Sequence, residues 1–254
     1  MLVKDFYNII DEYAPFELSD KLCKLENMHD NSGIIMDNGE EVKGVLFSLD
    51  LTNLAVDKAI LEGCNLIITH HPAIYHGIYK IDGALKKACE NKIAVISCHL
   101  NLDCAKYGID YYFAEGLGAK KQEILQKLTE ADEGYGRRFF VGQSLGSIRM
   151  HAEEVFNTQV ICYGYDSMHI NSVASFCGAG LGVPETYTEC DLLCSSDISH
   201  HVILSAIEQG KAVIEFTHFA SENYGFKKLY EHFLTNDKVD KNVKFVFFDD
   251  KRFV

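Results

Sequence analysis

The stretch Asn65-Leu66-Ile67-Ile68-Thr69-His70-His71-Pro72 decides the fold of this chain. Its apolar part is short, rich in β-branched residues and preceded by Gly63, which is typical of a buried strand. A regular strand would point one histidine into the core, because successive side chains alternate between its two faces. Pro72 cannot donate to a sheet ladder and restricts the preceding residue to extended geometry. We therefore expect the histidine pair at the end of the strand, where both imidazoles can face one cleft.

Two further apolar runs end in the same way. The run 92–98 is followed by His99-Leu100-Asn101-Leu102-Asp103, and the run 211–217 by His218-Phe219-Ala220-Ser221-Glu222. In open α/β sheets, ligands bind outside the carboxyl ends of the strands, so these three tails should converge. Two or three histidines with Asp103 and Glu222 fit a mixed nitrogen and oxygen site for one or two divalent cations.

Each of these features also has a purely structural explanation. His70 and His71 would suit a surface pair or a hydrogen-bonded turn. Ser221 is a good N-cap for a helix over 221–234, and Glu222 would then lie in its first turn, where a carboxylate is favoured. That helical role is compatible with metal binding. Cys98 and Cys104 flank the expected site, and we place Cys98 in the core because it closes an apolar strand.

The remaining pattern alternates between strands and helices. Helical spacing marks an opening helix from Leu2 to Tyr13, and a strand from Val42 to Leu49 leads to a helix with Thr52 as its N-cap. A strand–helix–strand order of this kind builds parallel sheets. The further predicted helices are 82–91, 109–117, 148–156, 198–209 and 221–234, and the further predicted strands are 139–143, 159–163, 170–176, 191–195, 212–217 and 243–248. The polar segment 131–136 is the best candidate boundary, so we predict an α/β fold of two similar halves, 1–130 and 131–254, with mostly parallel sheets flanked by helices.

Composition narrows the class of protein. The 254 residues are 47% apolar and carry a net charge of −13, so broad non-specific binding to nucleic acid is unfavourable. Lys86-Lys87, Lys120-Lys121 and Arg137-Arg138 could still each receive a phosphate, although solvated helix faces explain lysine pairs as well. No apolar run is long enough to span a bilayer, and the N-terminus lacks a signal-peptide core, so we expect no membrane association and a cytoplasmic location. Nine scattered cysteines without a CxxC pair suggest reduced thiols.

Several tempting features are expected not to bind metal. His200 and His201 lie in a helical pattern, where adjacent side chains diverge by about 100°. Gly178-Ala179-Gly180-Leu181-Gly182 lacks the lysine of a phosphate loop and suits a tight backbone turn, with a place in a cleft wall as the alternative. Four isolated histidines have no second ligand at a recognisable spacing, and we assign them to surface or core: His76, His151, His169 and His232.

The combined motifs resemble the GTP cyclohydrolase 1 type 2 family, also called Nif-three-like dinuclear metal-centre proteins. Ile68 to Pro72, His99 to Asp103 with Gly108-Ile109-Asp110 behind it, and His218 to Glu222 occur in the order typical of that family. The resemblance covers nearly the whole chain. The chain has no room for the domain that many members insert between the halves. Leu100 stands where a threonine is frequent, and Cys194-Ser195-Ser196-Asp197 departs from the usual pattern.

The resemblance implies a pair of divalent metal ions in a cleft between the halves. The implied ligands are His70, His71, Asp103, His218 and Glu222, with Glu222 bridging. It implies His71 and Asp103 on one ion, His70 and His218 on the other, and His99 as an additional ligand or a lining residue. It also implies subunits assembled into a toroidal homohexamer.

The function expected from this resemblance is metal-dependent hydrolysis. Water would add to the imidazole carbon of GTP, the ring would open, and formate would leave, with His99 and Asp103 assisting the attacking water. Zinc, iron and manganese all suit such ligands. Phosphoester hydrolysis of a small phosphorylated metabolite is one alternative. A non-catalytic ring that binds metal or partner proteins is another.

Overall fold

The computed structural model describes residues 1–73, 83–180 and 189–253, and they form two compact units. The first unit consists of Met1–Ala105 and Phe226–Lys251, and the second begins at Lys106 and runs to Gly225, with the last residues from Arg252 added to it. The boundary between Gly225 and Phe226 falls inside one continuous helix, α9 (His218–Thr235).

These units differ from the predicted halves 1–130 and 131–254. The C-terminal strand β11 (Lys244–Phe248) pairs with β2 (Gly44–Ser48) and therefore belongs to the first sheet. The polar segment 131–136 is no boundary, because it lies at the turn and start of a hairpin formed by β5 (Glu123–Lys127) and β6 (Gly134–Ser144).

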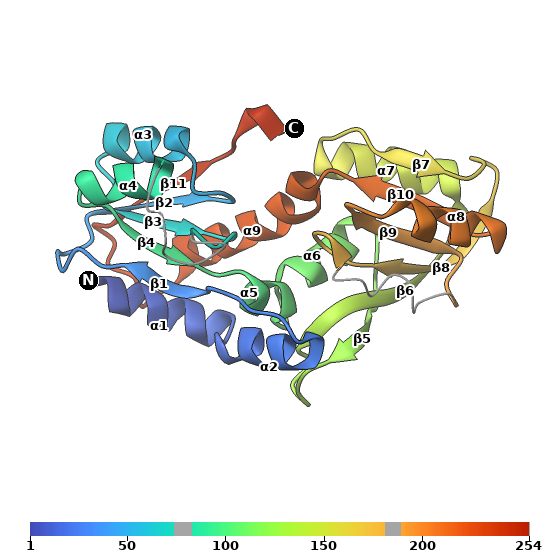
Figure 1. Cartoon of the computed structure of the whole chain (residues 1–254), viewed down its shortest axis with the longest axis horizontal. Coiled ribbons are helices and arrows are strands. Elements are labelled where there is room, and N and C mark those ends of the chain that lie inside the picture. Colours follow the sequence, from blue (N-terminus) through green and yellow to red (C-terminus); the bar gives the residue numbers. More distant parts are fainter. Residues whose placement is uncertain (74–82, 181–188, 254) are drawn as a thin grey trace. The chain divides into compact units, whose positions relative to one another are not determined.

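The first unit contains a five-stranded sheet in the order β1-β4-β3-β2-β11 (Figure 1). Three of its four pairings are parallel, and only β1 runs antiparallel to its neighbour. Its other elements are α1 (Val3–Tyr13), α2 (Glu17–Glu26), β1 (Gly33–Met36), α3 (Asn53–Glu62), β3 (Leu66–Thr69), α4 (Gly83–Glu90), β4 (Ala94–Ser97) and α5 (Leu100–Cys104).

Each face of the first sheet is covered by helices. On one face, Leu46, Ile67 and Val95 from three neighbouring strands pack in one cluster with residues of α3 and α4. On the other face, Phe47 lies against Phe226 and Phe233 of α9, with ring centroids 6.2 and 5.3 Å away. Because both faces are buried, the strands β2, β3 and β4 are apolar along most of their length, as the sequence pattern predicted.

The second unit contains a six-stranded sheet in the order β5-β6-β8-β9-β10-β7. Its remaining elements are α6 (Ile109–Gly116), α7 (Leu145–Phe156), β7 (Ile161–Tyr163), β8 (His169–Ser175), β9 (Leu192–Ser196), α8 (His200–Glu208) and β10 (Ala212–Phe216), and a 3-10 helix follows at Lys251–Phe253. Only β8, β9 and β10 are parallel to one another. The prediction of mostly parallel sheets is therefore correct for the first sheet and wrong for the second, where the β5–β6 hairpin, the β6–β8 pairing and the pairing of β10 with the edge strand β7 are antiparallel.

Aromatic side chains join the helices of the second unit to its sheet. Phe113 of α6, Phe156 of α7 and Phe216 of β10 form a triangle with ring centroids 5.1 to 5.4 Å apart. Such edge-to-face packing adds to the burial of apolar area.

Most predicted elements are confirmed to within a few residues. Thr52 caps α3 as predicted, because its hydroxyl accepts a hydrogen bond from the Ala55 amide at 3.1 Å. Gly63 ends the same helix with a φ of 71°. Among the described helices, none is long and apolar enough to cross a membrane. All nine cysteines lie in the described ranges as free thiols, and six are buried.

Candidate metal centre

The parallel strands of the first unit bring three histidines to one edge of the sheet. In β3 and β4, Thr69 pairs with Ser97, so the residues that follow both strands emerge side by side. The imidazole centroids of His70 and His99 lie 5.2 Å apart, and those of His71 and His99 lie 5.8 Å apart. One ring nitrogen from each histidine can be chosen so that all three lie within 4.8 Å of one another. The predicted convergence is thus confirmed for the first unit.

The turn after β3 holds both members of the histidine pair. The amides of His70 and His71 both donate to the carbonyl oxygen of Leu49, at 3.1 and 3.0 Å. This breaks the alternation of the strand, and the two rings come to lie 4.9 Å apart. His70 is buried and His71 is half-buried. The histidine pair therefore lies at the end of the strand, as the following proline suggested.

An oxygen acceptor fixes the Nδ1 nitrogen of each of these two rings. Nδ1 of His70 lies 2.8 Å from the carbonyl oxygen of Cys98, and Nδ1 of His71 lies 2.7 Å from Oδ1 of Asp50. A carbonyl or a carboxylate can only accept, so Nδ1 is the protonated nitrogen in both rings. The lone pair of each neutral ring is then on Nε2, which is the nitrogen that can bind a metal ion.

His99 is held in the same way by a more deeply buried acid. Its Nδ1 donates to Oδ1 of Asp30 at 2.8 Å, and the amide of His99 donates to the hydroxyl of Ser32 at 3.0 Å. Burial raises the pKa of Asp30, but the hydrogen bond and charge of His99 and the hydroxyls of Ser32 and Ser19 outweigh it and hold that pKa at about 2. Asp30 is therefore an anion that fixes the tautomer of His99 across the neutral range.

Asp103 lies close to the buried histidine. It is in the short helix α5 and is buried, and its Oδ1 lies 3.5 Å from Nε2 of His70. Ligand atoms bound at about 2.0–2.1 Å to a tetrahedral ion are roughly 3.3–3.4 Å apart. The separation of these two atoms fits an edge of such a coordination shell.

The second unit repeats this arrangement at the end of β10. His218 opens α9, and its Nδ1 donates to Oδ2 of Asp197 at 2.5 Å. Nε2 of His218 lies 3.1 Å from Oε1 of Glu222, one helical turn later, a spacing that again suits two ligands of one ion. Glu222 is buried, whereas His218 is partly exposed.

The prediction that Ser221 caps a helix beginning at 221 is wrong. The helix α9 begins at His218, so Ser221 lies within it, and its hydroxyl donates to the carbonyl oxygen of His218 at 2.8 Å. The same hydroxyl accepts from the amide of Gly178 at 3.0 Å. Ser221 thereby ties the glycine turn to the helix that carries His218 and Glu222.

Gly178 is the part of the glycine-rich motif that bears on the site. Its φ is +59°, in the left-handed region that favours glycine. A Cβ atom added there would lie 2.4 Å from Oε1 of Glu222. The motif therefore forms a tight turn against a predicted ligand, in line with the predicted cleft-wall alternative. Leu181 and Gly182 lie outside the described residues.

The cysteines near the site are core residues. Cys98 is buried and its thiol donates to the carbonyl oxygen of Thr69 at 3.2 Å. Burial, followed by the negative charge of Asp103, raises the pKa of the Cys98 thiol, so it stays protonated and does not offer a thiolate to a metal. Cys104 is likewise buried.

Among the described residues, the groups that could hold a metal ion include none of the histidines that we excluded. His200 and His201 are both exposed in the first turn of α8, and the imidazole of His201 contacts the hydroxyl of Ser199. His232 stacks on Tyr13 with centroids 4.5 Å apart, and burial lowers its pKa. His151 and His169 are exposed, and His76 lies outside the described residues.

Sequence reasoning missed the acids that hold the imidazoles, namely Asp30, Asp50 and Asp197. Two of them follow the ends of β2 and β9, so the rule that located the histidines would have located them too. Asp30 precedes β1, and the antiparallel pairing of Gly33 with Ser97 brings the start of β1 to the edge where β4 ends.

The described residues thus include buried groups of His, Asp and Glu that are suited to a metal ion. The donor set is chemically consistent, because neutral Nε2 nitrogens and carboxylate oxygens together suit zinc, iron or manganese. Whether His70, His71, Asp103, His218 and Glu222 ligate an ion stays a prediction.

Comparisons with known proteins agree with this description. A profile of the family described as Duf34/NIF3 (NGG1p interacting factor 3) matches residues 1–252. A Clostridium acetobutylicum protein named GTP cyclohydrolase 1 type 2 homolog is 32% identical over 87% of this chain and 85% of its own length. A Methanocaldococcus jannaschii protein of the same name is 28% identical over 93% of this chain and 96% of its own length.

Solved structures share the fold. The reduced form of HcgD from Methanocaldococcus jannaschii is 26% identical and superposes with a TM-score of 0.80, covering 98% of both chains. A Staphylococcus aureus hypothetical protein is 24% identical with a TM-score of 0.83, covering 100% of this chain and 99% of its own.

Proposed function

Because this chain belongs to the Duf34/NIF3 family, we propose that it is a metal-dependent hydrolase in which His70, His71, Asp103, His218 and Glu222 hold two divalent ions. One observation supports this proposal above the others. In each of four histidines, Nδ1 donates to a protein oxygen and the lone pair is left on Nε2: His70, His71, His99 and His218. Outer hydrogen bonds of this kind are typical of metal-binding histidines.

The helix α9 is continuous across the boundary between the two units. The first turns of α9 carry His218 and Glu222, and its next turn begins with Phe226. Residues four apart lie on the same face of a helix, so Glu222 and Phe226 share a face. The ring of Phe226 lies 6.2 Å from that of His70.

Metal ions held there would polarise the bond under attack and lower the pKa of a water molecule toward neutrality. His99 is the residue that we assign to proton transfer. Its Nδ1 is occupied by Asp30, so Nε2 can take a proton, and the Asp30 carboxylate stabilises the imidazolium that forms. Asp103 would balance part of the cationic charge beside His70.

For the reaction, we propose the ring-opening hydrolysis of GTP with release of formate. The support is the name of two relatives, GTP cyclohydrolase 1 type 2 homolog, together with a donor set suited to hydrolysis. We further propose that the chain works as a homohexameric ring, which light scattering of the purified protein would test.

The experiment compares the wild type with Asp103→Asn, with metal content measured for both, on GTP and on generic phosphoester substrates. We expect formate release from GTP by the wild type and a loss of about 10²-fold or more in the variant, because removing a charged group beside a metal centre weakens both metal binding and activity on that order. Asp20→Asn, which changes an exposed acid in α2 outside the site, is the matched control. Release of phosphate without formate would favour the phosphoesterase alternative. Equal trace activity of all variants on every substrate would favour the non-catalytic alternative.

A further inference from the structure

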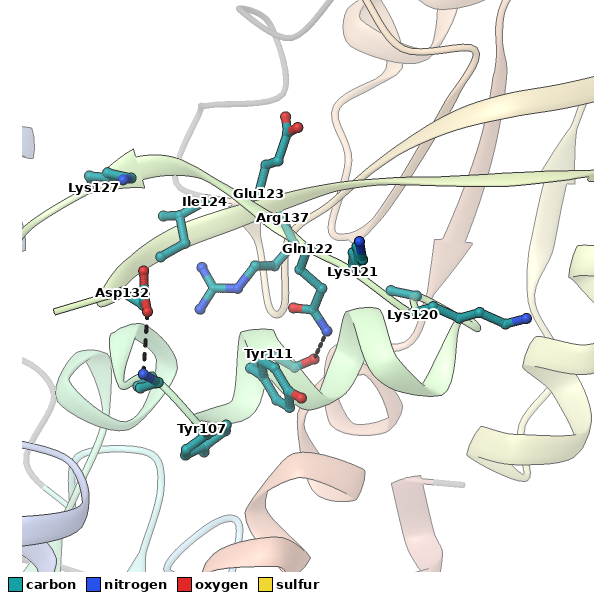
Figure 2. Close-up of a pocket in the computed structure, with 12 residues that line it drawn as sticks. Tyr107, Tyr111, Lys120, Lys121, Gln122, Glu123, Ile124, Lys127, Asp132 and Arg137 are labelled. Carbon is teal, nitrogen blue, oxygen red and sulfur yellow. Dashed lines mark hydrogen bonds and ion pairs between the residues drawn. The ribbon is translucent and has the colours of Figure 1, made fainter. Parts of the chain in front are cut away.

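A cavity of about 480 Å³ lies wholly within the second unit, between α6 and the β5–β6 hairpin (Figure 2). It contains none of the proposed metal ligands, so the inference drawn from it does not depend on the proposed function. Volumes of roughly 300–1,000 Å³ are usual for small-molecule sites. The residues that matter for its chemistry are Lys106, Tyr107, Tyr111, Lys120, Lys121 and Arg137.

The cavity carries positive charge in a protein that is otherwise strongly acidic. Its two lining carboxylates have cationic partners, because Asp132 pairs with Lys106 at 3.2 Å and Glu123 pairs with Arg138 at 3.1 Å. Within the described ranges, Lys120 and Lys121 form no ion pair. Two adjacent lysines that line the cavity therefore have no ion-pair partner among the described residues, against a net charge of −13 for the whole chain. Such a local concentration of positive charge attracts anions.

Arg137 adds a buried guanidinium to this cavity. Its side chain is 1% exposed, and its Nη1 forms an ion pair with Oδ2 of Asp110 at 3.4 Å. Its hydrogen bonds to the carbonyl oxygens of Gly134 and Gly136 also come from Nη1. In the part of the chain that the structure describes, Nη2 and Nε of Arg137 have no partner, and Figure 2 shows the guanidinium pointing from β6 toward the helix below it. Burying a guanidinium is costly unless its donors are satisfied, so an anion at Nη2 and Nε would complete this arrangement.

Two tyrosines give the cavity an aromatic side. The rings of Tyr107 and Tyr111 meet edge to face with centroids 5.2 Å apart, and Tyr107 is 49% exposed. An exposed aromatic ring beside lysines suits a planar ligand that also carries negative charge, because the ring can stack while the ammonium groups bind the anion.

We propose that this cavity binds a mononucleotide, with its phosphates on Lys120, Lys121 and Arg137 and its base on Tyr107. The volume fits one nucleotide, and the acidic surface of the chain disfavours a long nucleic acid strand. Lys120, Lys121 and Arg137, which belong to two of the basic pairs noted in the sequence, thus line one cavity rather than separate surface patches.

The test is calorimetric titration of the full-length protein, with its bound metal, using ATP, adenosine and inorganic tripolyphosphate. ATP should bind the wild type. The double variant Lys120→Ala with Lys121→Ala should bind ATP on the order of tenfold or more weakly, since two charged hydrogen bonds are lost. Lys86→Ala with Lys87→Ala is the matched control, because this adjacent pair lies in the first unit, and it should leave the affinity unchanged.

The aromatic contact is tested separately. Tyr107→Ala should weaken the binding of ATP severalfold and leave the binding of tripolyphosphate unchanged. The control Tyr165→Ala removes an 80% exposed ring that does not line the cavity, and it should change the binding of neither ligand. The proposal is overturned if the Lys120/Lys121 variant binds ATP as the wild type does. It is also overturned if Asp103→Asn abolishes ATP binding, which would assign the nucleotide to the metal centre, or if only single-stranded oligonucleotides bind.

Discussion

Nδ1 of His99 lies 2.8 Å from Oδ1 of Asp30, although the two residues are 69 positions apart in the sequence. The contact exists because β1 and β4 are antiparallel neighbours, so the segment before β1 meets the segment after β4. It gives a buried carboxylate a specific partner, and it orients one imidazole of the candidate site.

The Asp30–His99 contact leads to a prediction about pH and stability. The native pKa of Asp30 is about 2, below the ordinary value of 3.8, so its ionised form stabilises the fold. For a lowered carboxyl pKa, this contribution is complete above pH about 4 and is lost as the pH falls toward 2. Asp30→Asn should therefore lower the free energy of unfolding by about 2 kcal/mol at pH 7 and by much less at pH 2.5.

Urea unfolding in the presence of a chelator measures this difference without a contribution from metal. Asp20→Asn, at an exposed acid in the neighbouring helix α2, serves as the control and should change stability little at either pH. A wild-type–variant difference that stays the same from pH 7 to 2.5 would show that Asp30 is not the ionised partner of His99.

Gly178 provides a second prediction, on metal affinity. Gly178→Ala should cost about 1 kcal/mol in stability because of its positive φ, and it should also displace Glu222, which the new Cβ would approach to 2.4 Å. Gly210 also has a positive φ, +74°, but has open space around it. Gly210→Ala should therefore reproduce the stability loss alone.

Competition with a chromophoric zinc chelator separates the two glycine variants. We expect Gly178→Ala to bind zinc on the order of tenfold more weakly than Gly210→Ala, in the range found when groups next to metal ligands are changed. Equal zinc affinities of the two variants would mean that the position of Glu222 is irrelevant to metal binding.

Glu222 itself carries a third prediction. If this carboxylate bridges two ions, Glu222→Ala should remove more metal per chain than His99→Ala does, because a bridge serves both ions. Elemental analysis of protein purified without added metal gives the stoichiometry, and Glu208→Ala, at an exposed acid in α8, is the control. A Glu222→Ala protein that retains two metals per chain would rule out the bridge.

The second histidine pair offers the converse prediction. Replacing His200 and His201 with glutamine should leave the metal content near that of the wild type, because both side chains are exposed in the first turn of α8. The same double change at His70 and His71 should remove at least one equivalent of metal per chain. Loss of a whole equivalent from the His200/His201 variant would identify them as ligands after all.

The parts of the fold and of the candidate site that could be predicted from the sequence are those encoded in consecutive residues. The strands β2, β3, β4 and β10 are apolar runs with polar residues at their carboxyl ends, and those patterns are written in consecutive residues. Parallel pairing then places the tails of β3 and β4 together, which is why the convergence of the histidines in the first unit was predicted correctly.

The features that the sequence did not predict depend on contacts between residues that are far apart in the chain. The strand β1 is only four residues long and runs against its neighbour, and the sequence pattern did not reveal it. The role of Asp30 follows from that strand alone. Ser221 resembles a helix cap in sequence, but its hydroxyl bonds within α9 and to Gly178, a partner 43 positions away. The polar segment 131–136 resembles a linker because turns and linkers share the same residue types.

The pairing of β11 with β2 has a consequence for the order in which this chain can fold during synthesis. Residues 106–225 of the second unit form one uninterrupted stretch, and all of them are translated before the last strand of the first sheet. The nascent β2 must wait for a partner about 200 residues downstream, and such distant pairings are slow to form. Until then, one side of an apolar strand is uncovered, and a nascent chain stalled before residue 244 presents that open edge to other chains and to chaperones.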